Sequence, residues 1–231
     1  MKKLERKLTL SSVIAISVAG MLGSGIFVLP GIAAAKTGSS IWLAYLIAAI
    51  CILPAALSKS ELATAMPKSG GSYVYIERAL GPLFGTISGI GLWLSLLLKS
   101  SFALVGFGAY LLVLTNISPI YIKYFSIGFL IIIMLLNIFG VKKVGKVQLV
   151  IVILSLLTLL SLLLLGIPAV DKQLLTPFMN NGTMGLISTV AFVYISYAGV
   201  TKIAAIAGEV KNPSKNIPLS MLLSLLIISS V

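Results

Sequence analysis

The chain has 231 residues, of which 59% are hydrophobic and only 10% are charged. Soluble domains carry about 25% charged residues, so a soluble fold is excluded and a bilayer must be the solvent. The net charge of +12 would suggest nucleic acid binding in a soluble protein, but a membrane topology accounts for it and makes nucleic acid unnecessary as a partner. With Cys51 as the single cysteine and no histidine, the sequence excludes a disulfide framework and a histidine-based metal site, and we expect no cofactor.

Long runs without charge predict an all-α membrane protein. Most of them reach the roughly 20 residues that a helix needs to cross about 30 Å of hydrocarbon. We expect about six transmembrane helices, a truncated seventh, and a short interfacial helix between Pro67 and Pro82. The expected membrane helices are Ser11 to Lys36, Ile41 to Leu62, Leu83 to Thr115, Tyr121 to Gly140, Gly145 to Gly166, Met184 to Gly208, and Ile217 onward. The last run stops at Val231 among apolar residues, so we expect the chain to be part of a longer protein.

The basic residues give the topology. Thirteen of the 17 fall on one side of the predicted spans, at Lys2, Lys3, Arg6, Lys7, Lys59, Lys68, Arg78, Lys142, Lys143, Lys146, Lys202, Lys211 and Lys215. Only Lys36, Lys123 and Lys172 fall on the other side. By the positive-inside rule, the crowded side is cytoplasmic and carries the N-terminus. We therefore expect a multi-pass protein of the cell membrane.

Lys99 lies in the middle of the third predicted span. If it were a loop between two spans, every later segment would be inverted and the basic cluster at 142–146 would lie outside, so we predict one long helix. Intramembrane charges are candidates for function by default. Lys99 is accordingly a candidate for coupling or gating, with a proton gained and lost during transport. The alternative is a packing role, in which Lys99 donates to helix carbonyls or to Ser100 and Ser101.

The first span contains three consecutive residues, Gly23, Ser24 and Gly25, that predict a break in the helix. Glycine inside a helix costs about 1 kcal/mol relative to alanine. Small residues one turn apart would form a packing stripe, which is the alternative for isolated glycines. Three consecutive small residues instead face three directions, so a local interruption explains them better.

The sixth span repeats this feature, with Ser196, Ala198 and Gly199 between two apolar halves. Five spans separate the two equivalent positions, and an odd number of spans makes the second copy inverted, as in inverted-repeat secondary transporters. We expect one permease domain over 1–231, with a first five-helix repeat at 1–166 and the beginning of a second repeat at 184–231.

Such breaks leave backbone groups unpaired at bilayer depth, where a polar ligand can satisfy them. Free N–H groups at residues 23–25, at the positive end of a half-helix, suit a carboxylate. Carbonyls near Ile195, Ser196 and Tyr197 suit an ammonium group. Tyr194 and Tyr197 could shape or gate the pocket, or could simply pack.

Three motifs, GSGIFVLPG, PKSGGSYVYIERALG and AGEVKNPSKNIP, resemble the amino acid, polyamine and organocation (APC) superfamily of permeases. The resemblance covers essentially all 231 residues and about half of such a transporter, which has a leucine-transporter-like fold. It implies an amino acid substrate whose carboxylate meets Gly23, Ser24 and Gly25 and whose amine meets the span-six backbone near Ile195, Ser196 and Gly199. It allows a proton or a sodium ion as co-substrate and does not choose between them.

Three other functions stay open from sequence. An enzyme is disfavoured because the five acidic residues lie at interfaces or loops and form no intramembrane pair. A channel or membrane scaffold would predict continuous helices in spans one and six. A truncated permease fragment without transport activity is the third alternative.

Overall fold

The computed structural model describes residues 6–115, 118–138, 141–166, 168, 178–179 and 181–230. Within these ranges the regular elements are helices, and the β interaction is an isolated bridge between Leu8 and Val210. The α-helices are α1 (Leu10–Phe27), α2 (Leu29–Thr37), α3 (Ile41–Ala65), α4 (Ser72–Leu80), α5 (Pro82–Thr115), α6 (Ile122–Ile138), α7 (Val141–Gly166), α8 (Gly182–Tyr197) and α9 (Pro213–Ser230). Short 3₁₀ helices occupy η1 (Gly38–Ser40) and η2 (Pro119–Tyr121), and a long one forms η5 (Ala198–Glu209). The predicted all-helical class is thus confirmed for the described residues.

Four segments of the described chain are long and apolar enough to cross a membrane, judged by length and composition alone. They are Gly25–Ala65, Pro82–Leu112, Leu149–Gly166 and Gly182–Glu209. Two shorter apolar helices, Leu10–Gly23 and Ile122–Leu136, accompany them. These segments cover the six predicted spans, although the number of crossings stays a prediction.

The third predicted span and the interfacial segment both match observed helices. Helix α5 is continuous over 34 residues and carries Lys99 within it, as predicted. Helix α4 is a nine-residue amphipathic helix that begins after Gly71 and ends at Gly81, two glycines with positive φ of 72° and 90°. It packs against α5, so the chain reverses direction between them.

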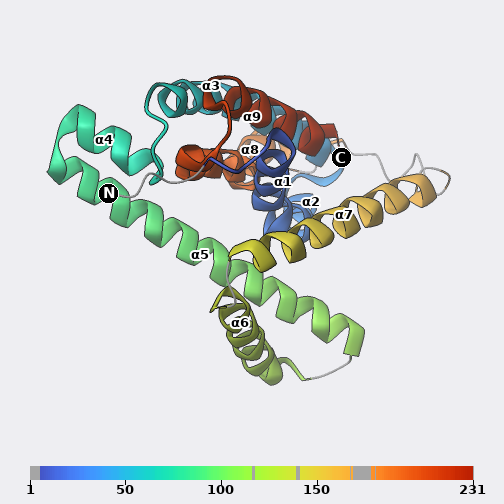
Figure 1. The fold of residues 1–231 in the computed structure, drawn as a ribbon. Coiled ribbons are helices and arrows are strands. Elements are labelled where there is room, and N and C mark those ends of the chain that lie inside the picture. Colours follow the sequence, from blue (N-terminus) through green and yellow to red (C-terminus); the bar gives the residue numbers. More distant parts are fainter. Residues whose placement is uncertain are drawn as a thin grey trace.

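The buried core lies among α1, α3, α8, η5 and α9. Helix α1 packs against α9, η5 and α8, and α3 packs against α8 and α9. Figure 1 shows these elements gathered together, while α5, α6 and α7 extend away from them. The side chains buried to 0% exposure come mainly from the gathered elements, among them Val13, Met21, Ala48, Val193 and Ile203. The first and sixth predicted spans therefore meet at the centre of the packed part.

The segments that the charge pattern assigns to the cytoplasmic side contact one another. Leu8 N–H donates to the Glu209 carbonyl at 2.9 Å, and Lys211 N–H donates to the Leu8 carbonyl at 2.9 Å. Gly70, in the loop after α3, donates to the Ala205 carbonyl at 3.1 Å. At the other end of the first span, Asn181 donates through Nδ2 to the Lys36 carbonyl at 2.6 Å. This arrangement is compatible with the predicted topology.

Candidate functional site

The first span is interrupted, as its glycines predict. Gly23 has non-helical dihedrals, φ −1° and ψ −132°, inside α1. A second irregularity follows at Val28, after which α2 begins with Pro30 in its first turn. Proline has no N–H and therefore cannot donate to the preceding turn. The span thus consists of two helices, where a single one from Ser11 to Lys36 was predicted.

The sixth span changes its helix type at the predicted weak point. Helix α8 ends at Tyr197, and the following twelve residues, Ala198–Glu209, form the 3₁₀ helix η5. Runs of 3₁₀ helix longer than three or four residues are uncommon, and within a longer helix they often mark a hinge or a strained segment. The change of pitch replaces the single helix predicted from Met184 to Gly208.

The two interruptions pack against each other almost without side chains between them. A Cβ placed on Gly25 would lie 2.8 Å from the Ser196 Cβ and 3.0 Å from its Cα. A Cβ placed on Gly199 would run into the backbone of Gly20 and Met21. Only glycine allows so close an approach of α1 to α8 and η5. These contacts place the mid-depth segments of spans one and six side by side.

Side chains from three other helices donate to carbonyls of α1 around the interruption. The Gly25 carbonyl accepts from the Tyr45 hydroxyl of α3 at 2.9 Å and from the Ser196 hydroxyl of α8 at 3.2 Å. The Tyr110 hydroxyl of α5 donates to the Phe27 carbonyl. Backbone carbonyls that a regular helix would satisfy internally thus have side-chain donors here.

Lys99 is one of these donors. Its ammonium, at the middle of α5, donates to the Gly20 carbonyl at 3.1 Å. In an uninterrupted helix this carbonyl would accept from the N–H of residue 24, which lies beyond the kink at Gly23. The neighbours Ser100 and Ser101 donate instead to carbonyls of their own helix, those of Leu96 and Leu97. Of the packing partners expected for Lys99, the structure therefore shows a helix carbonyl.

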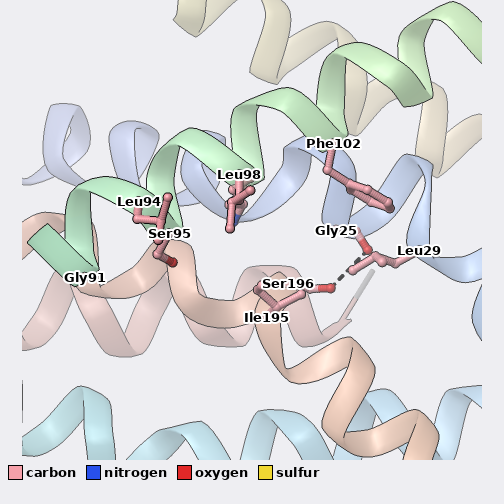
Figure 2. A pocket seen from close by; sticks show the side chains of 10 residues that line it. Gly25, Leu29, Gly91, Leu94, Ser95, Leu98, Phe102, Ile195 and Ser196 are labelled. Atoms are coloured by element: carbon pink, nitrogen blue, oxygen red, sulfur yellow. Dashed lines mark hydrogen bonds between the residues drawn. The ribbon is translucent and has the colours of Figure 1, made fainter.

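A cavity of about 560 Å³ lies beside the meeting point of the two interruptions. Ligand sites commonly fall between about 300 and 1,000 Å³. Figure 2 shows Gly25 and Ser196 joined by their hydrogen bond, with side chains of α5 pointing toward them. The cavity is lined by Gly25, Leu29, Gly91, Leu94, Ser95, Leu98, Lys99, Phe102, Ile195 and Ser196.

The structure brings together some of the predicted site residues. Gly25, Ile195 and Ser196 line the cavity together with Lys99. Gly23 and Ser24 belong to the kinked turn, and the described features of Ser24 are those of its backbone.

The remaining predicted residues lie outside the cavity lining. Tyr197 is 2% exposed and makes an edge contact with Tyr45, with ring centroids 6.4 Å apart. Gly199 packs on Gly20, and Tyr194 packs against the hydrophobic core. A packing role thus accounts for both tyrosines in this structure.

Sequence reasoning missed several residues of the site. Tyr45 and Tyr110 carry no local signal, because their partners are carbonyls far along the chain, at Gly25 and Phe27. Leu98 and Phe102 look like ordinary membrane-helix residues. Their spacing from Lys99 on one long helix was the available signal, since residues three and four apart share a helix face.

These features define an all-helical membrane protein with two interrupted helices that meet beside a cavity. A sequence profile described as "Amino acid permease" matches residues 8–231, and the chain belongs to this family. The predicted membership of the APC superfamily of permeases is thereby confirmed.

Curated relatives carry transporter names. The branched-chain amino acid permease BcaP of Bacillus subtilis is 30% identical over 98% of this chain and 52% of the relative. The methylthioribose transporter of the same organism is 27% identical over 97% of this chain and 52% of the relative. Its serine/threonine exchanger SteT is 27% identical over 99% and 53%, respectively. The chain spans about half the length of these relatives.

Proposed function

We propose that the protein is a secondary active transporter that moves amino acids across the cell membrane by alternating access. The observation that carries the proposal is the direct contact of two interrupted helices, Gly25 on Ser196 and Gly20 on Gly199, beside a cavity. Interrupted helices at mid-depth are a recurrent way of building a substrate site in inverted-repeat transporters. Membership of the amino acid permease family and the names of BcaP and SteT favour an amino acid substrate.

The substrate would bind as a zwitterion between the two interruptions. Its carboxylate is placed at the backbone N–H groups of Gly23, Ser24 and Gly25, where the second half of the span begins and its dipole is positive. Its amine is placed at the backbone near Ile195 and Ser196. Gly25, Ile195 and Ser196 line the cavity, which supports this orientation.

Lys99 would couple the movement of α5 to that of α1. Its hydrogen bond to the Gly20 carbonyl joins the middle of α5 to the half-helix before the kink. Gain and loss of a proton at this group would change the strength of that link, since hydrogen bonds from charged donors are stronger than neutral ones. A role of Tyr194 in gating has less support, because its side chain packs against the core.

A channel is the competing function among membrane proteins. Continuous helices in spans one and six would favour it, and the kink at Gly23 and the change of pitch after Tyr197 argue against it. An enzyme is disfavoured by the transporter names of the matched relatives. The topology proposed from the basic residues places the N-terminus in the cytoplasm.

Uptake by proteoliposomes tests the proposed function. The natural full-length protein that contains residues 1–231 would be reconstituted and offered a panel of labelled amino acids, with and without proton and sodium gradients. We expect saturable uptake of at least one amino acid, and a dependence on one gradient would identify the co-substrate. Absence of saturable uptake for the whole panel would remove the assignment.

A further inference from the structure

The cavity beside the two interruptions has one face formed by α5. Leu94, Leu98 and Phe102 are spaced four residues apart, so they lie along one face of this helix. Figure 2 shows Leu98 and Phe102 pointing from α5 toward the segment that carries Gly25 and Ser196. We call these three side chains the α5 face of the cavity.

The surroundings of the α5 face are also apolar. Leu29 of α2 and Ile195 of α8 line the same cavity, and the polar side chains that join them are Ser95, Ser196 and Lys99. Leu98 is 58% exposed and Phe102 is 38% exposed, so each retains apolar surface that a ligand in the cavity could cover. Burial of apolar ligand surface against such side chains is favourable, whereas burial of an unpaired charge is costly.

Among the described lining residues, Lys99 is the charged one, and its charge is positive. A second cation entering a membrane cavity beside it would meet repulsion and would find no carboxylate among these lining residues to pair with. The zwitterion of a neutral amino acid meets no such penalty, because its carboxylate balances its ammonium group.

We propose that the cavity selects neutral amino acids with apolar side chains, that Leu98 and Phe102 set the size of side chain accepted, and that Lys99 disfavours cationic substrates. The inference rests on the proposed transport function and adds its substrate class. It assigns a specificity role to two α5 residues. A hydrophobic contact of this kind discriminates between substrates by about tenfold or more for each methylene group.

Competition in proteoliposomes tests this selectivity. The natural full-length protein would take up radiolabelled leucine in the presence of unlabelled alanine, leucine, phenylalanine, serine, lysine or arginine. We expect leucine and phenylalanine to compete at concentrations about tenfold lower than serine does. Lysine and arginine should compete still less. Competition by lysine or arginine as strong as that by leucine would overturn the proposed substrate class.

Two substitutions on the α5 face test the size determinant, each with a control on the same helix. Leu98→Phe should reduce the room in the cavity and weaken competition by phenylalanine about tenfold relative to alanine. Phe102→Ala should enlarge the cavity and shift the preference toward bulky side chains. The controls are Leu97→Phe and Phe84→Ala, because Leu97 and Phe84 lie on α5 and outside the cavity lining.

The opposite directions of the two shifts protect the test against misfolding, since a damaged protein would lose all substrates together. If Leu98→Phe abolishes uptake, Phe102→Ala alone decides the question. Rankings in Leu98→Phe and Phe102→Ala that match those of their controls would overturn the size determinant while transport itself stands. Failure of the wild-type protein to take up any amino acid would instead overturn the proposed function and this inference with it.

Discussion

The ammonium of Lys99, at the middle of α5, donates a hydrogen bond of 3.1 Å to the backbone carbonyl of Gly20, three residues before the kink of α1. A charged side chain inside an apolar span thus has a partner that the interruption of another span provides. Lys202 of η5 also approaches this point, because its Cδ would lie 3.1 Å from a Cβ placed on Gly20. The interruption therefore bears on the role of Lys99 as well as on substrate binding.

Removal of the Lys99 side chain should weaken both stability and transport. In Lys99→Ala, the Gly20 carbonyl loses a charged donor, and such a loss costs about 1–3 kcal/mol. We expect a lower melting temperature in detergent and slower uptake. Lys99→Arg should retain part of both, since arginine remains a charged donor. Ser101→Ala is the matched control, because Ser101 donates only within α5, to the Leu97 carbonyl at 3.0 Å.

The pH dependence of uptake separates a coupling role of Lys99 from a packing role. If Lys99 gains and loses a proton in each cycle, Lys99→Arg should transport with little dependence on pH, since arginine stays charged. Lys202→Ala, which removes the neighbouring titratable group, should keep the wild-type profile. A Lys99→Ala protein with the wild-type pH dependence would contradict the coupling role and leave the packing role.

Substitution of Gly25 should separate α1 from α8. In Gly25→Ala, the new methyl group would meet the Ser196 Cβ at 2.8 Å. Overpacking of this kind typically costs about 1–3 kcal/mol. Gly31→Ala is the control, because nothing lies within 4 Å of a Cβ placed there. Alanine at this α2 position should be neutral or stabilise by up to about 1 kcal/mol. Equal melting temperatures for the two variants would contradict the close contact.

The two hydroxyls on the Gly25 carbonyl should act redundantly. Either Tyr45→Phe or Ser196→Ala leaves this carbonyl with one donor, so each alone should cost only about 0.5–1.5 kcal/mol. The double variant leaves a buried acceptor unpaired and should cost more than the sum. A double-mutant cycle on thermal stability measures the difference. Strict additivity would show that the two hydrogen bonds do not share this acceptor.

Labelling of single cysteines tests the proposed topology. In a Cys51→Ser background, Arg78→Cys on α4 should react with a membrane-impermeant maleimide only after cells are opened. Lys123→Cys, after α5, should react in intact cells. The opposite pattern would contradict the cytoplasmic placement of the N-terminus that the basic residues predict.

The extents of the helices could be predicted from sequence because charges and turn residues bound the apolar runs. The expected helix from Leu83 to Thr115 is observed as Pro82–Thr115, and the expected end at Gly166 is observed. The interruption at Gly23 was also predictable, since consecutive small residues weaken a helix locally. The 3₁₀ pitch of Ala198–Glu209 was not, because its cause lies in packing against α1 at Gly20.

The composition of the site was only partly predictable. Glycines announce a break by themselves, so Gly25 could be named in advance. The donors that satisfy the exposed carbonyls, Tyr45 and Tyr110, are separated from their acceptors by 20 and 83 positions. No local pattern encodes such a pairing. Lys99 was singled out by its charge, but its partner depends on how α5 crosses α1.

An experimental structure of the natural full-length protein with leucine bound would test the central claim most directly. The account predicts the substrate carboxylate within hydrogen-bond distance of backbone N–H groups at residues 23–25, its amine at carbonyls of residues 195–199, and its side chain against Leu98 and Phe102. A substrate bound away from these segments, with residues 23–25 in an unbroken helix, would contradict it.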